Sequence, residues 1–204
     1  MVAAGLAIWN VVAVWGSGMI TDAVRDLYHA HWGEPSRRAS FRVGGDEVEI
    51  FKWSAEANPE GVNLYATVGA SARPMAGRDL KHRVEFFLGL LRAKDEVASP
   101  LAALALYSAR EDVALDHGHT VPAEGPLWPG TEMRRFLVLR PIGDIISPLE
   151  LPDGIHVEFL QAIPVFESEC AYKSNHGAAA LLRRWEESGV PFWDPGRSPQ
   201  PALS

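Results

Sequence analysis

Three short stretches in which polar and apolar residues alternate constrain the fold of this chain most. They are residues 47–53 (EVEIFKW), 63–69 (NLYATVG) and 83–91 (RVEFFLGLL). Pairs of turn-forming residues lie beside them, at Gly44-Gly45, Asn58-Pro59 and Arg73-Pro74. Strand-like runs joined by such turns generally pair with their neighbours along the chain. The pattern therefore predicts adjacent strands of a mainly antiparallel sheet.

A helical pattern precedes these strands. From Thr21, a candidate N-cap, apolar residues recur on one face until Gly33 ends the run. We therefore expect an N-terminal helix within residues 19–34.

A second helix is predicted after the third strand. Ser99 followed by Pro100 is typical of an N-cap and a first helical position. We expect Leu101, Leu104 and Ala105 of this helix to face the sheet.

The C-terminal half repeats this alternation of strands and helix. Residues 134–141 (RRFLVLRP) and 155–165 (IHVEFLQAIPV) predict two strands, and residues 167–188 predict a helix with a bend or break at Gly177. Residues 191–204 are typical of irregular structure. The order β-β-β-α-β-β-α behind an N-terminal helix indicates a single α+β domain, in which helices pack on a mainly antiparallel sheet.

The N-terminus carries an apolar run, residues 2–15, broken only by Asn10. The run is shorter than the roughly 20 apolar residues that span a bilayer, so we expect no stable membrane insertion. It also lacks the basic region of a signal peptide, because no Lys or Arg precedes Arg25. We expect residues 1–18 to be an upstream extension, with Met19 as the biological start. A native element packed on the core and a membrane tether are the alternatives.

Net charge and cysteine content narrow the partner classes and the compartment. The formal net charge of -7 disfavours binding to nucleic acid and attracts a basic protein. Cys170 is the one cysteine among 204 residues, which excludes an internal disulfide and suits a reducing compartment, so we expect a cytoplasmic protein. Glu167 and Glu169 beside it oppose thiolate formation, so we interpret Cys170 as structural.

Residues 115–120 (LDHGHT) hold the densest group of ionisable side chains: Asp116, His117 and His119. Catalytic zinc needs about three protein ligands and an open position, and no nearby residue completes a known zinc motif. We therefore expect no metal and no cofactor. We interpret the segment as a shaped loop in which Gly118 permits the turn, with a metal-dependent enzyme as the alternative.

Two further motifs are candidates for catalysis. The GASAR segment, residues 69–73, resembles a nucleophile elbow around Ser71, but Arg73 replaces the last glycine, which favours a strand end. Glu85 and Glu158 interrupt apolar strands and are explained either as a carboxylate pair or, more simply, as residues on the solvent face. No complete catalytic group results, and we expect a protein that is not an enzyme.

Five stretches in order resemble the suppressor-of-fused domain family. They are LYATVGASARPM (64–75), HRVEFFLGL (82–90), SPLAALALYSA (99–109), LDHGHTVP (115–122) and VEFLQAIPVFESECAYKSNHGAAALLRRW (157–185). The last combines a buried strand, an acidic helix start and a helix that follows a glycine. The resemblance covers about residues 35–190 and implies an α/β sandwich-like single domain.

The resemblance also implies a function. Animal members of the family bind a short peptide of a partner protein as an added strand, at positions that fall here on Tyr107, Leu115 and His119. His119 stands where the animal proteins have an acid, so the peptide should differ. Bacterial single-domain members resemble immunity proteins, which implies neutralisation of a cognate toxin, such as a basic toxin domain. A regulatory peptide-binding scaffold is the alternative.

Overall fold

A single sheet organises the fold, which is given by a computed structural model describing residues 6–43, 45–75, 78–108, 113–152 and 154–200. Among these residues eight strands pair in the order β1-β2-β3-β4-β8-β6-β5, and β7 pairs with β8 outside this path. The strands are β1 (Arg37–Val43), β2 (Asp46–Trp53), β3 (Asn63–Val68), β4 (His82–Leu90), β5 (Thr120–Pro122), β6 (Arg135–Leu139), β7 (Leu149–Glu150) and β8 (His156–Val165).

Strands β1 to β4 form an antiparallel meander, as the alternating stretches predict. The predictions of β2, β3 and β4 are each confirmed to within one residue at either end. Strand β1 was not predicted, because six of its seven residues are exposed and it therefore lacks an apolar face. The expected α+β fold with a mainly antiparallel sheet is confirmed.

The two halves of the sheet meet along one parallel pair. Strand β4 runs parallel to β8, with His82 opposite His156 and Phe86 opposite Leu160. Every other strand pair in the described part of the chain is antiparallel. Parallel partners need a long connection, and here that connection contains a helix and strands β5 to β7.

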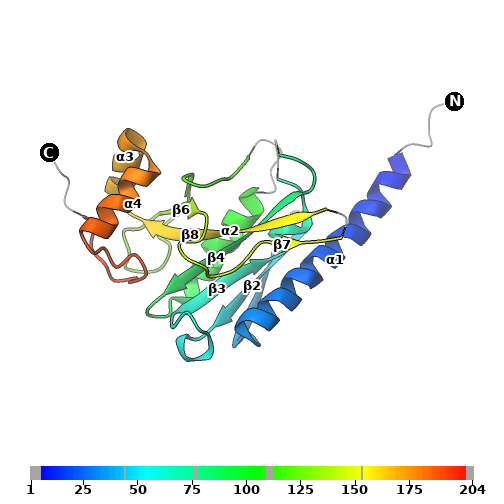
Figure 1. Cartoon of the computed structure of the whole chain (residues 1–204), viewed down its shortest axis with the longest axis horizontal. Coiled ribbons are helices and arrows are strands. Elements are labelled where there is room, and N and C mark those ends of the chain that lie inside the picture. Colours follow the sequence, from blue (N-terminus) through cyan, green and yellow to red (C-terminus); the bar gives the residue numbers. More distant parts are fainter. Residues whose placement is uncertain (1–5, 44, 76–77, 109–112, 153, 201–204) are drawn as a thin grey trace.

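Helix α1 (Leu6–Trp32) crosses one face of the sheet, and its N-terminal part extends beyond the sheet (Figure 1). Its Tyr28 and Trp32 are buried and contact Trp53 of β2, with ring centroids 5.8 and 5.1 Å apart. The predicted start at Thr21 is wrong: the helix begins at Leu6, and the Thr21 hydroxyl donates to the Gly18 carbonyl inside it. None of the described helices is long and apolar enough to span a membrane.

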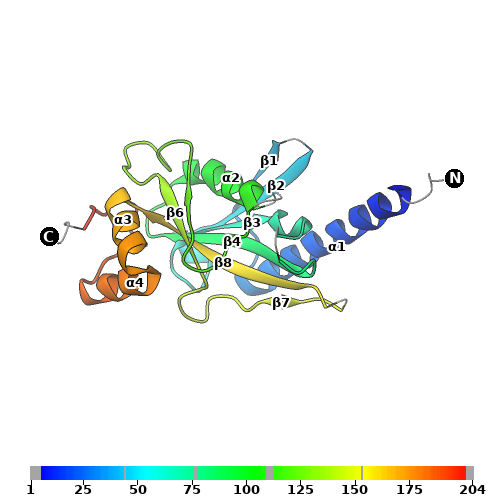
Figure 2. The same ribbon diagram turned by 90° about the horizontal axis from the view of Figure 1, so that it is seen from above.

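Helix α2 (Ala98–Ser108) covers the opposite face of the sheet (Figure 2). Leu101, Leu104 and Ala105 are buried there, as predicted. The predicted N-cap at Ser99 is wrong, because the chain enters α2 at Ala98 directly from the 3-10 turn η3 (Asp95–Val97).

Helices α3 (Glu167–His176) and α4 (Ala178–Glu187) lie at the end of the molecule away from the N-terminus (Figure 2). Gly177 separates them with a φ of 87°, which confirms the predicted break. The residues that follow, up to residue 200, form no helix or strand. They nevertheless contact the core, because the Leu91 N–H donates to the Trp193 carbonyl at 2.8 Å and Arg197 is buried.

Candidate functional site

The LDHGHT segment forms a tight loop that leads into β5. The backbone N–H of His117 donates to Oδ1 of Asp116 at 2.7 Å, and that of His119 donates to the Asp116 carbonyl at 3.1 Å. Gly118 has a φ of 86°, as the prediction of a glycine-dependent turn requires. The Gly118 N–H donates to the Val138 carbonyl, and the Val138 N–H donates to the His119 carbonyl, both at 2.8 Å. The loop is therefore held to β6 by main-chain bonds.

Both imidazoles of the loop accept hydrogen bonds from the backbone. His117 Nδ1 accepts from the Arg140 N–H at 3.2 Å, and His119 Nδ1 accepts from the Asp116 N–H at 3.3 Å. An imidazole that accepts at Nδ1 carries its proton on Nε2, so neither ring presents a lone pair to a metal. Within the described residues, no three His, Cys, Asp or Glu side chains are grouped to hold an ion. These hydrogen bonds favour the interpretation of the segment as a shaped loop.

Ion pairs fix the start of the loop. Asp116 bonds to Arg78 and lies 3.4 Å from Arg140, whose Nε donates to Glu158 at 2.8 Å. Burial raises the pKa of Asp116, but the His117 N–H and the two arginines more than offset this and hold it below its usual value. The carboxylate therefore stays charged and keeps its neighbours in place.

Two of the three predicted contact residues, Leu115 and His119, belong to this loop, and the third, Tyr107, lies on α2. Leu115 is buried in the core between the sheet and α2, and the half-buried Tyr107 of α2 packs against the same core. His119 is exposed on the loop. Leu115 thus belongs to the core and Tyr107 packs against it, and of the three only His119 is exposed.

Strand β5 ends the sheet beside the loop. It pairs with β6, and no other described strand pairs with its outer edge. An open edge presents main-chain N–H and C=O groups to an incoming strand. Successive residues of a strand direct their N–H groups to opposite edges, and the Ala123 N–H, which donates to the Arg134 carbonyl, places Val121 on the β6 side. Pro122 has no N–H, so Thr120 supplies the one N–H donor of this short outer edge. The arrangement can accept one extended segment of another chain.

The carboxylate pair considered for Glu85 and Glu158 does not form, because the two residues lie on opposite faces of the sheet. Phe159, the register partner of Glu85, faces α1, whereas Val84, the register partner of Glu158, faces α2. The expected solvent exposure of Glu85 is also wrong, since its side chain is fully buried.

Glu85 is instead a buried anchor for the 3-10 turn η2 (Ala70–Ala72). Its carboxylate accepts from the Ser71 hydroxyl at 2.6 Å, the Gly69 N–H at 2.9 Å and the Thr67 hydroxyl at 2.5 Å. Burial raises the pKa of Glu85 above its usual value, and these hydrogen bonds oppose that shift. Ser71 therefore holds a turn at the strand end, as the prediction stated.

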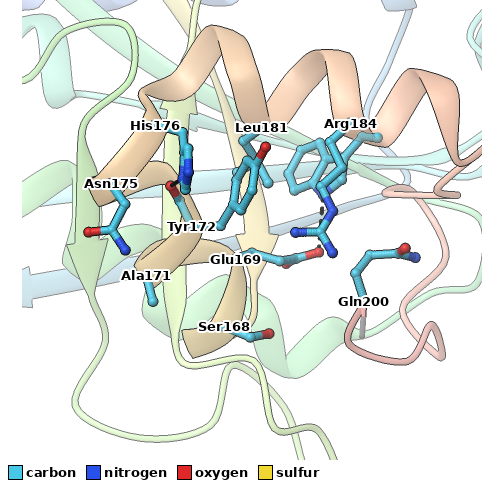
Figure 3. Close-up of a pocket in the computed structure, with 10 residues that line it drawn as sticks. Ser168, Glu169, Ala171, Tyr172, Asn175, His176, Leu181, Arg184 and Gln200 are labelled. Atoms are coloured by element: carbon cyan, nitrogen blue, oxygen red, sulfur yellow. Dashed lines mark hydrogen bonds between the residues drawn. The ribbon is translucent and has the colours of Figure 1, made fainter. Parts of the chain in front are cut away.

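A pocket of about 230 Å³, which the sequence analysis does not predict, lies between α3, α4 and the C-terminal tail (Figure 3). Its Tyr172 ring is stacked on His176 at 4.3 Å and lies 4.7 Å from the Arg184 guanidinium. Leu181 and Gln200 are also part of the lining. Because the pocket is formed by contacts between α3 and α4, such as that of Tyr172 with Arg184, local patterns within each helix do not reveal it.

The fold is shared with several solved structures. A suppressor-of-fused homolog from Neisseria gonorrhoeae is 21% identical, with a TM-score of 0.67 over 90% of this chain and 98% of that one. The structure of a Sufu-Fu complex is 16% identical, with a TM-score of 0.59 and 82% of each chain covered. Drosophila Suppressor of Fused is also 16% identical, with a TM-score of 0.58, and 80% of this chain covers 45% of that protein.

The sequence itself gives the family. No curated protein matches the chain. Residues 44–198 match the model of the Suppressor of fused protein (SUFU) family. This match spans most of the 204 residues. The chain is therefore a member of the SUFU family.

Proposed function

We propose that this chain is a protein-binding module that holds an extended segment of a partner on the outer edge of β5. The observation that carries the proposal is the open edge of β5 beside a loop fixed by main-chain and ionic bonds. A fixed loop lowers the entropy lost on binding, and strand addition supplies main-chain hydrogen bonds. Membership of the SUFU family supports the same mode.

The side chains have separate roles in this proposal. Tyr107 and Leu115 form an apolar base on the α2 side, and His119 contacts a side chain of the partner. With its proton on Nε2, the His119 ring offers a hydrogen-bond donor to that side chain. The partner residue facing His119 is thus expected to be a hydrogen-bond acceptor.

Affinity capture from a lysate of the source organism tests the proposal. The baits are the wild type, Tyr107→Ala and His119→Asn, and captured proteins are identified by mass spectrometry. The asparagine keeps an acceptor for the Asp116 N–H, so the loop retains its shape while the ring is lost. The exposed His176→Ala, on α3, is the matched control. Leu115 is not changed, because truncating a buried leucine lowers stability.

The proposal expects one stoichiometric partner that the wild type and His176→Ala retain and that the other two variants lose. A purified partner then allows titration calorimetry, in which the two variants should bind at least about tenfold more weakly. If Tyr107→Ala and His119→Asn bind that partner as tightly as the wild type, the β5 edge is not the binding site.

The finer proposal is that the partner is a toxin and that binding neutralises it. The net charge of -7 suits a basic toxin domain, since opposite charges accelerate association and orient the partners. Affinity should then fall as salt is raised from about 0.05 to 0.5 M, and co-expression should restore growth of cells that make the toxin. Binding without growth rescue would instead identify a regulatory scaffold.

A further inference from the structure

Strand β1 forms the other end of the sheet and is unusually open. It pairs with β2, and its outer edge has no strand partner in the described part of the chain. Every residue of β1 except Phe41 is exposed. The β1–β2 hairpin lies at the outside of the molecule (Figure 2). A seven-residue edge of this kind is long enough to pair with another strand along its whole length.

A groove runs beside β1 on the face that α2 covers. Its volume is about 300 Å³, and Ala39, Phe41 and Ile50 line its sheet side, while Ala98 and Ser99 line its helix side. Successive side chains of a strand point to opposite faces, so Ala39 and Phe41 share the groove face. An incoming strand would place every second side chain above this groove.

The charged residues of β1 are all basic. Arg37, Arg38 and Arg42 are its charged residues, and it contains no acid. Each pairs with a carboxylate outside β1: Arg37 with Asp95 at 2.5 Å, Arg38 with Glu34 at 3.1 Å and Arg42 with Glu47 at 3.0 Å. All three are exposed ion pairs, which contribute little to stability and exchange readily. A strand added to β1 would lie closest to the arginines themselves.

This charge disfavours a second copy of the chain as the occupant. Two β1 strands paired antiparallel about Ser40 would place Arg38 of each opposite Arg42 of the other. Like charges directly opposite each other destabilise a strand pair. Acidic residues at the same cross-strand positions would stabilise it.

We propose that β1 and its groove bind an extended segment of another protein in which acidic and apolar residues alternate. The segment pairs with the outer edge of β1. Its apolar side chains enter the groove beside Ala39 and Phe41, and its acidic side chains lie opposite Arg38 and Arg42. This surface is separate from the β5 edge, which lies at the other end of the sheet.

Peptide selection tests this proposal. A phage-displayed library of random peptides of about 12 residues, long enough to span β1, is selected on the immobilised wild-type chain. Enriched sequences should alternate acidic with apolar residues. Each enriched peptide is synthesised, and its affinity is measured by fluorescence anisotropy.

Two variants change the site in different ways. Ala39→Phe fills the groove, and Arg42→Glu reverses one charge at an exposed position. Arg183→Glu, at an exposed position of α4, is the matched charge control. We expect each site variant to weaken peptide binding at least about tenfold and the control to leave it unchanged. Thermal unfolding verifies that each variant folds, and if Ala39→Phe does not fold, Arg42→Glu decides alone.

The outcome is independent of the β5 proposal. Peptides bound at β1 should retain full affinity for His119→Asn. The proposal for β1 is overturned if no enriched peptide depends on Ala39 or Arg42, or if enriched peptides lack acidic residues. Peptides that respond only to His119→Asn would overturn it in the same way and would support the β5 edge.

Discussion

The guanidinium of Arg197 is bonded to the carboxylate of Glu169, with Nη1 2.6 Å from Oε1 and Nη2 2.8 Å from Oε2. Both side chains are only 2% exposed. The Trp185 indole N–H and the Phe166 backbone N–H donate to the same carboxylate, at 3.1 and 2.9 Å. Because Arg197 lies in the C-terminal tail and Glu169 in α3, this pair attaches the tail to the core.

Removing one partner of this pair should be costly. Arg197→Ala leaves the Glu169 carboxylate buried without its main counter-charge, and we expect the free energy of unfolding to fall by about 3–5 kcal/mol. Urea denaturation followed by tryptophan fluorescence measures it. The exposed Arg183→Ala should change the same quantity by less than about 0.5 kcal/mol. A loss below about 1 kcal/mol for Arg197→Ala would contradict the buried pair.

Gly89→Ala should overpack the contact between β4 and the tail. A Cβ at this position would clash with one ring carbon of Trp193 and lie 2.7 Å from another, and it would lie 2.8 Å from Val62. We expect a loss of about 1–3 kcal/mol in the free energy of unfolding.

A double-mutant cycle with Trp193→Ala tests the cause of that loss. If the ring is the obstacle, adding Gly89→Ala to the Trp193→Ala variant should cost clearly less than adding it to the wild type. Equal costs in the two backgrounds would assign the effect to Val62 or to the backbone.

Stability should depend on pH through His82. Burial lowers the pKa of His82 below 6.5; Glu158 and Asp116 oppose this shift, while His156 and Arg78 add to it. Since the folded pKa is lower than the unfolded one, the unfolded chain binds more protons between the two values. The wild type should therefore lose stability relative to His82→Asn as pH falls from about 7.5 to 5.5.

Urea denaturation across this pH range measures the effect of His82. His176→Asn, which changes an exposed histidine of α3, should keep the pH dependence of the wild type. A difference between the wild type and His82→Asn that does not vary with pH would refute the assignment.

Cys170 should react slowly in the folded protein. Burial raises the pKa of its thiol to about 11, with Glu167 and Glu169 adding to the shift and Arg135 opposing it. Compared with an ordinary thiol of pKa 9.0, this leaves about 100-fold less thiolate at pH 8. Modification by Ellman's reagent should be about 100-fold faster in denaturing urea than in buffer. Equal rates would show that the thiol is accessible and ionised.

The sequence predicted those elements whose formation depends on residues close together in the chain. Strands β2 to β4 alternate between faces and are separated by turn residues, and Gly177 interrupts a helix by its own backbone freedom. The N-cap predicted at Thr21 failed because the apolar run before it continues the same helix. A candidate cap marks a helix start only where the residues before it are not helical.

The features that the sequence did not predict depend on contacts between residues far apart in the chain. Glu85 was expected at the surface because one polar residue in an apolar strand is typical of a solvent face, but Thr67 and Ser71 satisfy it inside the core. The LDHGHT loop was found from its own composition. The edge position of β5 was not, since three residues with a proline carry no strand signal and only the sheet order reveals the open edge.

The parallel pairing of β4 with β8 has a consequence for how the chain reaches its native state. Strands β1 to β4 pair with sequence neighbours, so this meander can form early, as the chain leaves the ribosome. The β4 edge of this meander has no partner strand until residues 156–165, which form β8, have been synthesised. During that interval β4 is an apolar edge strand without a partner. We therefore expect the pairing of β4 with β8 to be the slowest and most aggregation-prone step of folding.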